Sequence, residues 1–126
     1  ITDAYGIIKS IASQSTEKTI RLIVNRCQSV SEARRVADRI INIASQFLNI
    51  KVENLGFIFE DSFVAKAVRH QKPFVSSYPK SRAAGCVNII ADKIAGREPE
   101  GSYGGGISGL FKRLFTQVDD EEDDIE

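Results

Sequence analysis

The sequence has few of the residues from which metal sites and disulfide frameworks are built. Its 126 residues include two cysteines and one histidine, and there is no Met or Trp. Cys27 and Cys86 have no CxxC spacing, so we expect neither a zinc site nor a disulfide framework. The pattern instead predicts two reduced, buried core residues of a cytoplasmic protein. His70, in AVRHQKPF, has no carboxylate or nucleophile pattern around it, and we assign it no catalytic role.

Long apolar runs are also missing. No window approaches the roughly 18 apolar residues that a membrane-spanning helix needs. The opening residues ITDAYGIIKS lack the basic start and apolar run of a signal peptide. They also lack an initiator Met, and we therefore expect the chain to be part of a longer protein.

The formal net charge of zero hides a strong asymmetry. Residues 119–126, DDEEDDIE, contain seven acids and no base, which leaves 17 bases against 10 acids in the rest. A basic body beside an acidic end suggests an anionic partner for the body, or an end that acts as its internal competitor. The alternative is an acidic tail, disordered, that only keeps the chain soluble.

The hydrophobic pattern predicts an α/β protein. In chain order we expect a helix over 2–13, a strand over 20–24, a long helix from Ser29 to 48, a strand over 53–59, a helix after Asp61 that stops before Pro73, and a helix over 79–95 closed by Gly96. Strand, long helix and strand form a βαβ unit with parallel strands. Neither strand alternates apolar and polar residues, so helices are expected on both faces. Two strands are too few for such a sheet, which predicts one edge of a larger sheet.

The helical periodicity also predicts which side chains face the core. The long helix should bury Ala33, Val36, Ala37, Ile40, Ile41, Ala44, Phe47 and Leu48; the next helix Val64, Ala67 and Val68; and the last helix Ala83, Val87, Ile90, Ala91 and Ile94. Pro79 is expected in the first turn of that last helix.

A glycine-rich stretch lies in the last quarter of the chain. GGGISG, at 104–109, matches the letters GxGxxG, but it follows a polar segment where a phosphate-binding loop needs a buried strand. We interpret 97–106 as a flexible linker. Beyond it, 107–118 has one apolar stripe at helical spacing, and its side chains could dock on the domain or lie in a membrane interface.

The order of several segments resembles a known family. ITDAYGIIKSI, IRLIVNRC and LGFIFEDSFVAKAVRHQKPFVSSYPKSRAA are similar to the C-terminal half of MinD-like ATPases, deviant P-loop proteins of the ParA/MinD superfamily. Within that group the chain most resembles the regulators of flagellar placement and number called FlhG (also YlxH or FleN). The septum-site protein MinD is the next nearest.

The resemblance implies the C-terminal edge portion of a P-loop NTPase-type parallel sheet, which here would be residues 1–96. It implies ATP and Mg²⁺ as cofactors of the longer protein, with none expected for this chain alone. The phosphate loop and the magnesium-binding residues belong to the N-terminal half, so we expect no catalytic residue and no activity in this chain. The adenine end of the site is carried over onto Asn25, Arg26, Phe59, Glu60 and Asp61.

Three of these assignments have competing interpretations. Phe59 stands where the family often has Pro, and its ring could stack on the base or close the pocket. Asn25 could instead be a turn-forming residue, and Asp61 an ordinary helix cap.

The resemblance makes 107–118 a reversible membrane anchor on the inner face of the cell membrane. The membrane-binding residues would be Ile107, Leu110, Phe111, Lys112, Arg113, Leu114, Phe115 and Val118. The implied partners are an anionic membrane surface, a second copy in the ATP-bound state, and a flagellar GTPase, basal-body or division-site protein. No sequence-specific nucleic acid is expected. Three alternatives remain open: division-site placement, a DNA-associated partition ATPase, and a membrane-tethered interaction module without nucleotide.

Overall fold

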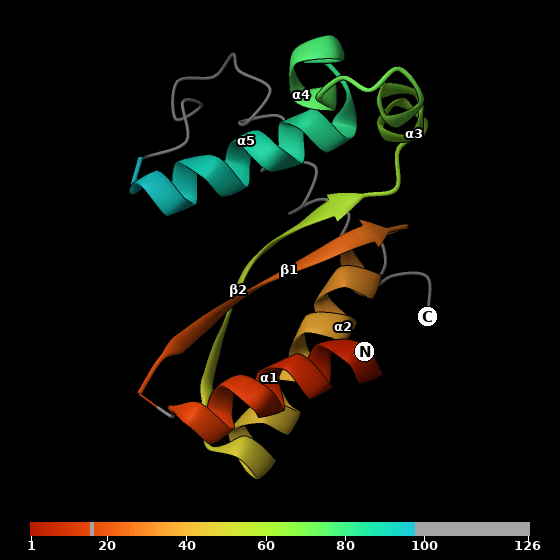
Figure 1. Cartoon of the computed structure of the whole chain (residues 1–126). Helices are drawn as coiled ribbons and strands as arrows, with labels where there is room; N and C mark the ends of the chain where they lie inside the picture. The colour runs from red at the N-terminus through yellow and green to blue at the C-terminus, as the bar shows by residue number, and fades with distance from the viewer. Residues whose placement is uncertain (16, 98–126) are drawn as a thin grey trace, which may run out of the picture.

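The computed structural model describes residues 1–15 and 17–97 of the chain (Figure 1). Its elements are α1 (Thr2–Gln14), β1 (Thr19–Cys27), α2 (Val30–Ile43), the π-helix η1 (Ala44–Leu48), β2 (Lys51–Phe59), α3 (Ser62–Arg69), α4 (Phe74–Ser77) and α5 (Arg82–Ala95). The predicted order of helices and strands is confirmed, and each strand begins earlier than the pattern indicated.

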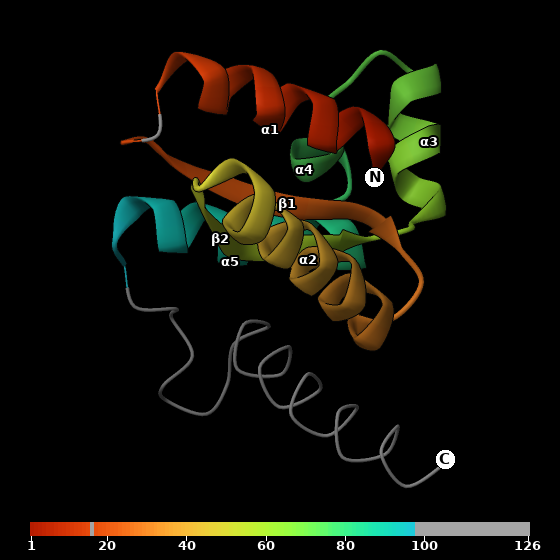
Figure 2. The ribbon, with the colours of Figure 1, turned by 90° about the horizontal axis from the view of Figure 1, so that it is seen from below.

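β1 and β2 are parallel neighbours joined through α2 and η1, as the βαβ prediction requires. α1 and α2 lie on one side of the two strands and α5 lies on the other (Figures 1 and 2). The predicted α/β class, with a parallel sheet and helices on both faces, is therefore confirmed. α3 lies near the carboxyl ends of the strands, and α4 lies beside the beginning of α5 (Figure 1).

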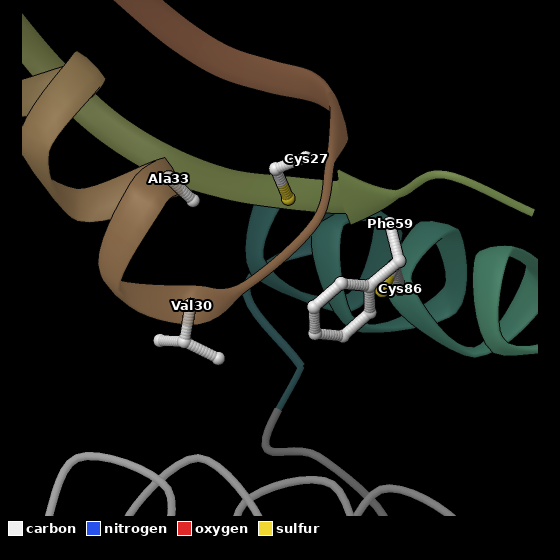
Figure 3. Close-up of a cluster of buried hydrophobic side chains, with 5 residues drawn as sticks. All are labelled: Cys27, Val30, Ala33, Phe59 and Cys86. Atoms are coloured by element: carbon white, nitrogen blue, oxygen red, sulfur yellow. The ribbon is translucent and has the colours of Figure 1, made fainter. Parts of the chain in front are cut away.

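The core consists of two apolar clusters. One joins α1 to the α2–η1 unit and the amino-terminal parts of the strands, through Ile8, Ile40, Ala44, Ile50 and Val52. The other lies at the carboxyl ends of the strands and consists of Cys27, Val30, Ala33, Phe59 and Cys86 (Figure 3). The second cluster packs under the turns that carry the predicted site residues, and its burial supports them.

A bulge in β2 lets α5 approach the sheet closely. The register shifts between Leu22 and Ile23, and Gly56 pairs with Ile23 at a φ of 152°. A Cβ atom at Gly56 would lie 3.0 Å from Ile90 Cγ1 on α5. The Leu55 carbonyl at the bulge accepts a hydrogen bond from Lys93 Nζ at 3.1 Å. Glycine at this position therefore satisfies both the backbone conformation and the helix contact.

The helix ends follow the predicted capping residues with one change of partner. Ser29 Oγ accepts from the Glu32 N–H at 3.1 Å, as a capping box requires. Glu32 Oε2 accepts from the N–H of Gln28, one residue earlier than in that motif, at 2.7 Å. Gly96 ends α5 in the left-handed conformation, at a φ of 69°.

The start of the last helix was predicted wrongly. α5 begins at Arg82, and Pro79 lies in a turn before it, in which the Ser81 N–H donates to the Tyr78 carbonyl at 3.1 Å. Proline favours the second position of such a turn because its φ is already fixed there. Ser81 then caps the helix by accepting from the Ala84 N–H at 3.2 Å. The short helix α4 in the same region was not predicted.

Several residues expected in the core are exposed. Phe47 is 71% exposed, Val68 69% and Ile94 57%, and Ala91 is exposed as well. Phe47 lies in η1, where the wider π turn shifts the stripe out of the period of the preceding α-helix. α5 packs on the sheet through a narrow stripe that includes Ala83, Cys86 and Ile90, and this stripe leaves Ala91 and Ile94 outside the contact.

Candidate functional site

The carboxyl ends of β1 and β2 bring Arg26 and Glu60 together. Arg26 Nε lies 2.8 Å from Glu60 Oε2, and the Glu60 N–H donates to the Cys27 carbonyl at 2.9 Å. Arg26 adopts a left-handed φ of 58°, next to the register shift between Val24 and Cys27. The hydrogen bond to Glu60 and its negative charge raise the pKa of Arg26. The pair therefore links the two strand ends at an exposed surface, where such pairs contribute little stability.

Asn25 lies beside this pair with its side chain exposed. Its Oδ1 accepts from the Arg26 N–H at 2.9 Å, as in the turn-forming interpretation. Its amide nitrogen forms no hydrogen bond within the part of the chain that the structure describes. The Asn25 amide thus holds the local backbone with one end and presents two donors at the other.

Asp61 connects two helices to the end of β2. Its Oδ1 accepts from the Phe63 N–H at 2.9 Å, which confirms the predicted cap of α3. Its Oδ2 accepts from the Ala83 N–H in the first turn of α5 at 3.0 Å. Both carboxylate oxygens are therefore bound to backbone donors at the amino ends of helices, where a negative charge is favoured.

Phe59 lies in the core at the end of β2 and is 6% exposed. Its ring meets the ring of Phe57 edge-on, with the centroids 5.2 Å apart. The Arg82 guanidinium lies 4.1 Å from the Phe59 ring centroid. Phe59 is therefore a core residue of this edge, and both roles expected for it toward a base stay predictions.

The cysteines of the same cluster are free and buried, which confirms the expectation of core residues (Figure 3). Cys27 Sγ lies 3.4 Å from the Ile58 carbonyl oxygen. Burial raises the pKa of both thiols, Cys27 and Cys86. A raised pKa disfavours the thiolate, so both cysteines are poor nucleophiles.

Sequence reasoning missed Arg82 and the second partner of Asp61. Both contacts join residues more than twenty positions apart, on elements whose packing sets the distance. The local motif found the Asp61 cap of α3, because that hydrogen bond spans two residues. Nothing in the local sequence indicates a contact between Phe59 and Arg82.

The remaining assignments fall mostly outside the described residues. These are the linker beyond Arg97, the predicted membrane-binding residues of 107–118 and the acidic segment 119–126. Within 1–15 and 17–97, no helix is long and apolar enough to cross a membrane. The same residues include no group of three His, Cys, Asp or Glu side chains placed to hold a metal ion.

Comparison with known proteins shows a partial similarity to a curated protein. No family model matches the chain. Over 94 residues it is 29% identical to the antiactivator FleN of Pseudomonas aeruginosa, an alignment that covers 75% of this chain and 34% of that protein. The chain thus spans about a third of the length of this curated relative. This distant, partial match supports the chain's resemblance to FlhG-type regulators only weakly.

Proposed function

We propose that this chain is the C-terminal part of a membrane-associated, MinD-like ATPase that regulates flagellar placement or number. In that protein it would supply the adenine end of the ATP site and a reversible membrane anchor. The observation that carries the proposal is the meeting of Asn25, Arg26 and Glu60 at the carboxyl ends of two parallel strands. Ligands of open α/β sheets bind at this end of the strands. The partial similarity to FleN supports the flagellar role.

The chemistry of this edge suits a purine ring. The Asn25 amide nitrogen offers donors for a ring nitrogen of adenine. The Arg26–Glu60 pair provides a planar guanidinium and a carboxylate beside it at the same strand ends. Phe59 would form the apolar base of the site, and Asp61 would fix the turn after β2 through its hydrogen bonds. ATP phosphates and Mg²⁺ would be bound by residues of the longer protein that this chain does not include.

Nucleoside titration followed by NMR tests the adenine end. We expect adenosine to shift the backbone amides of Asn25, Arg26, Glu60 and Asp61, with a dissociation constant of about 1 mM or weaker. ATP should bind no more tightly than adenosine, because the phosphate contacts are missing. Asn25→Ala should abolish the shifts, whereas Asn88→Ala, an exposed helix position, should leave them unchanged.

Two results would overturn this part of the proposal. One is the absence of any shift at the strand ends with adenosine, and the other is ATP binding far tighter than adenosine binding. Guanosine serves as the specificity control, since its ring edge reverses the donor and acceptor positions that Asn25 would meet.

Vesicle flotation tests the membrane anchor. Burial of an apolar side chain contributes at most about 1.5–3 kcal/mol, so one Phe decides much of the affinity of a short segment. We expect Phe111→Glu to abolish flotation with anionic vesicles. Thr116→Glu, the same charge change on the polar stripe, should retain most of it. Equal flotation of the parent chain and Phe111→Glu would reject the anchor.

A further inference from the structure

Residues 62–91 carry five cationic side chains and no acid. All five are exposed, and four of them lie on α3 and in the segments between α3 and α5. We call these four the α3–α4 cationic surface: Lys66, Arg69, Lys72 and Lys80. The fifth, Arg82, lies over the Phe59 ring. The helix α3, which carries Lys66 and Arg69, lies near the carboxyl ends of the strands (Figure 1).

Three other cations of the described chain have acidic partners. Arg26 pairs with Glu60, Lys51 with Glu53, and Arg97 with Asp92. No residue of the α3–α4 cationic surface has an acidic partner within residues 1–15 and 17–97. A group of like charges without counter-charges attracts an anionic partner, and this attraction weakens as salt is added.

An aromatic pair, Phe63 and Tyr78, lies beside one of these cations, Lys66. The Phe63 side chain is 44% exposed, and its ring centroid lies 4.9 Å from that of Tyr78. Lys66 Nζ lies 5.7 Å from the Tyr78 ring centroid. A fitting partner therefore combines several carboxylates with an apolar residue.

The segment DDEEDDIE at 119–126 has this composition, with seven acids and Ile125. Residues 98–118, which connect this segment to the described part of the chain, are long enough to let it reach the surface. α5 has 14 residues and is therefore about 21 Å long, and the surface begins at the turn before it. Residues 98–118 would span about 30 Å even if they were helical throughout, and more if extended.

We propose that the acidic segment 119–126 docks on the α3–α4 cationic surface of its own chain. Carboxylates bind near Lys66, Arg69, Lys72 and Lys80, and Ile125 packs toward the exposed Phe63. Attachment to the same chain favours this contact over one with a second copy, because it raises the local concentration of the segment. The docked segment competes with any other anionic partner for this surface. The contact does not depend on the proposed ATPase role.

NMR of the full chain and of a chain ending at residue 118 tests the docking. We expect the truncation to shift the amides of Lys66, Arg69, Lys72 and Lys80 at about 50 mM salt. At this salt concentration, the attraction between charges in contact is only weakly screened. Adding about 0.5 M salt to the full chain should reproduce much of that shift. The peptide DDEEDDIE, added to the truncated chain, should reverse it, with an affinity at least about tenfold lower at high salt.

Charge reversal supplies the matched variants. Lys66→Glu with Lys72→Glu should abolish the effect of truncation on the remaining amides. Lys9→Glu with Lys18→Glu, two exposed lysines outside the surface, should leave it intact. Truncation shifts confined to another region would overturn the proposal. Shifts that depend on protein concentration would assign the docking to a second copy and overturn the intramolecular contact.

Discussion

The junction at the strand ends, formed by Arg26, Glu60 and Asp61, differs from the α3–α4 cationic surface in how its polar groups are satisfied. At the junction, Arg26 binds Glu60, and Asp61 uses each oxygen for a different helix. At the cationic surface, the described chain offers no counter-charge to Lys66 or Lys72. Polar groups satisfied within the chain fix its geometry, whereas exposed unpaired charges are available to a partner. The comparison predicts large stability effects at the buried and helix-capping groups of the first region, and small effects at its exposed ion pair and at the second region.

The largest effect is expected at Phe59, beneath the junction. Phe59→Ala removes a ring that is 6% exposed and leaves a cavity between the strand end and α5, which should cost about 3–5 kcal/mol. Urea unfolding followed by circular dichroism measures the change. Phe47→Ala is the matched control because Phe47 is 71% exposed, and its effect should stay within about 0.5 kcal/mol. Equal losses in the two variants would contradict the packing described.

The next effect is expected at Asp61. Asp61→Ala leaves the N–H groups of Phe63 and Ala83 without their acceptor, which should lower the free energy of unfolding by about 1–3 kcal/mol. Asp61→Asn should lose less, because an amide oxygen still caps α3. Asp38→Ala, at an exposed position of α2, provides the control in the same urea experiment. A loss no larger than in this control would show that the two hydrogen bonds contribute nothing.

A smaller effect, confined to alkaline pH, is expected from the buried thiols. Burial raises the pKa of Cys27 and Cys86 in the folded state above the value of about 8.5 for an unfolded chain. The unfolded state then loses these protons first, so stability is complete below that pH and falls as the pH rises. Urea midpoints between pH 7.5 and 10 measure the slope.

The double variant Cys27→Ala with Cys86→Ala is the control for this slope. Its overall stability is expected to fall because packing is lost, so only the pH dependence is compared. The slope should be flatter than in the parent chain. An unchanged slope would assign the alkaline loss to other titrating groups.

The local sequence indicates much of the fold because its signals act over a few residues. The structure shows the elements that these local signals predict. The signals are the caps at Ser29 and Asp61, the αL position at Gly96 and the two apolar strands. The errors arise where packing between elements, or the helix type, decides which side chains are buried. The π turn exposes Phe47, and the contact of α5 with β2 leaves Ile94 exposed.

The same distinction holds for the candidate site. Parallel strands predict that Asn25, Arg26 and Glu60 meet at one edge, and the structure places Arg26 and Glu60 2.8 Å apart. The second hydrogen bond of Asp61 depends on where α5 begins, and Pro79 was expected inside that helix. Once Pro79 lies in the turn before Ser81, the Ala83 N–H comes within reach of Asp61 Oδ2.

The smallest effect is expected from the Arg26–Glu60 pair, although it belongs to the junction. The side chains are 77% and 41% exposed, so water and salt screen the attraction. A double-mutant cycle of Arg26→Gln and Glu60→Gln should give a coupling close to measurement error, and about 0.5 M salt should remove it. The parallel cycle of Lys72→Gln and Glu60→Gln should show no coupling at either salt concentration. A large coupling that persists in salt would mean that the pair holds the strand ends together. A small one assigns that role to Phe59 and Asp61, and leaves Arg26 and Glu60 free to exchange their contact for a ligand at low cost.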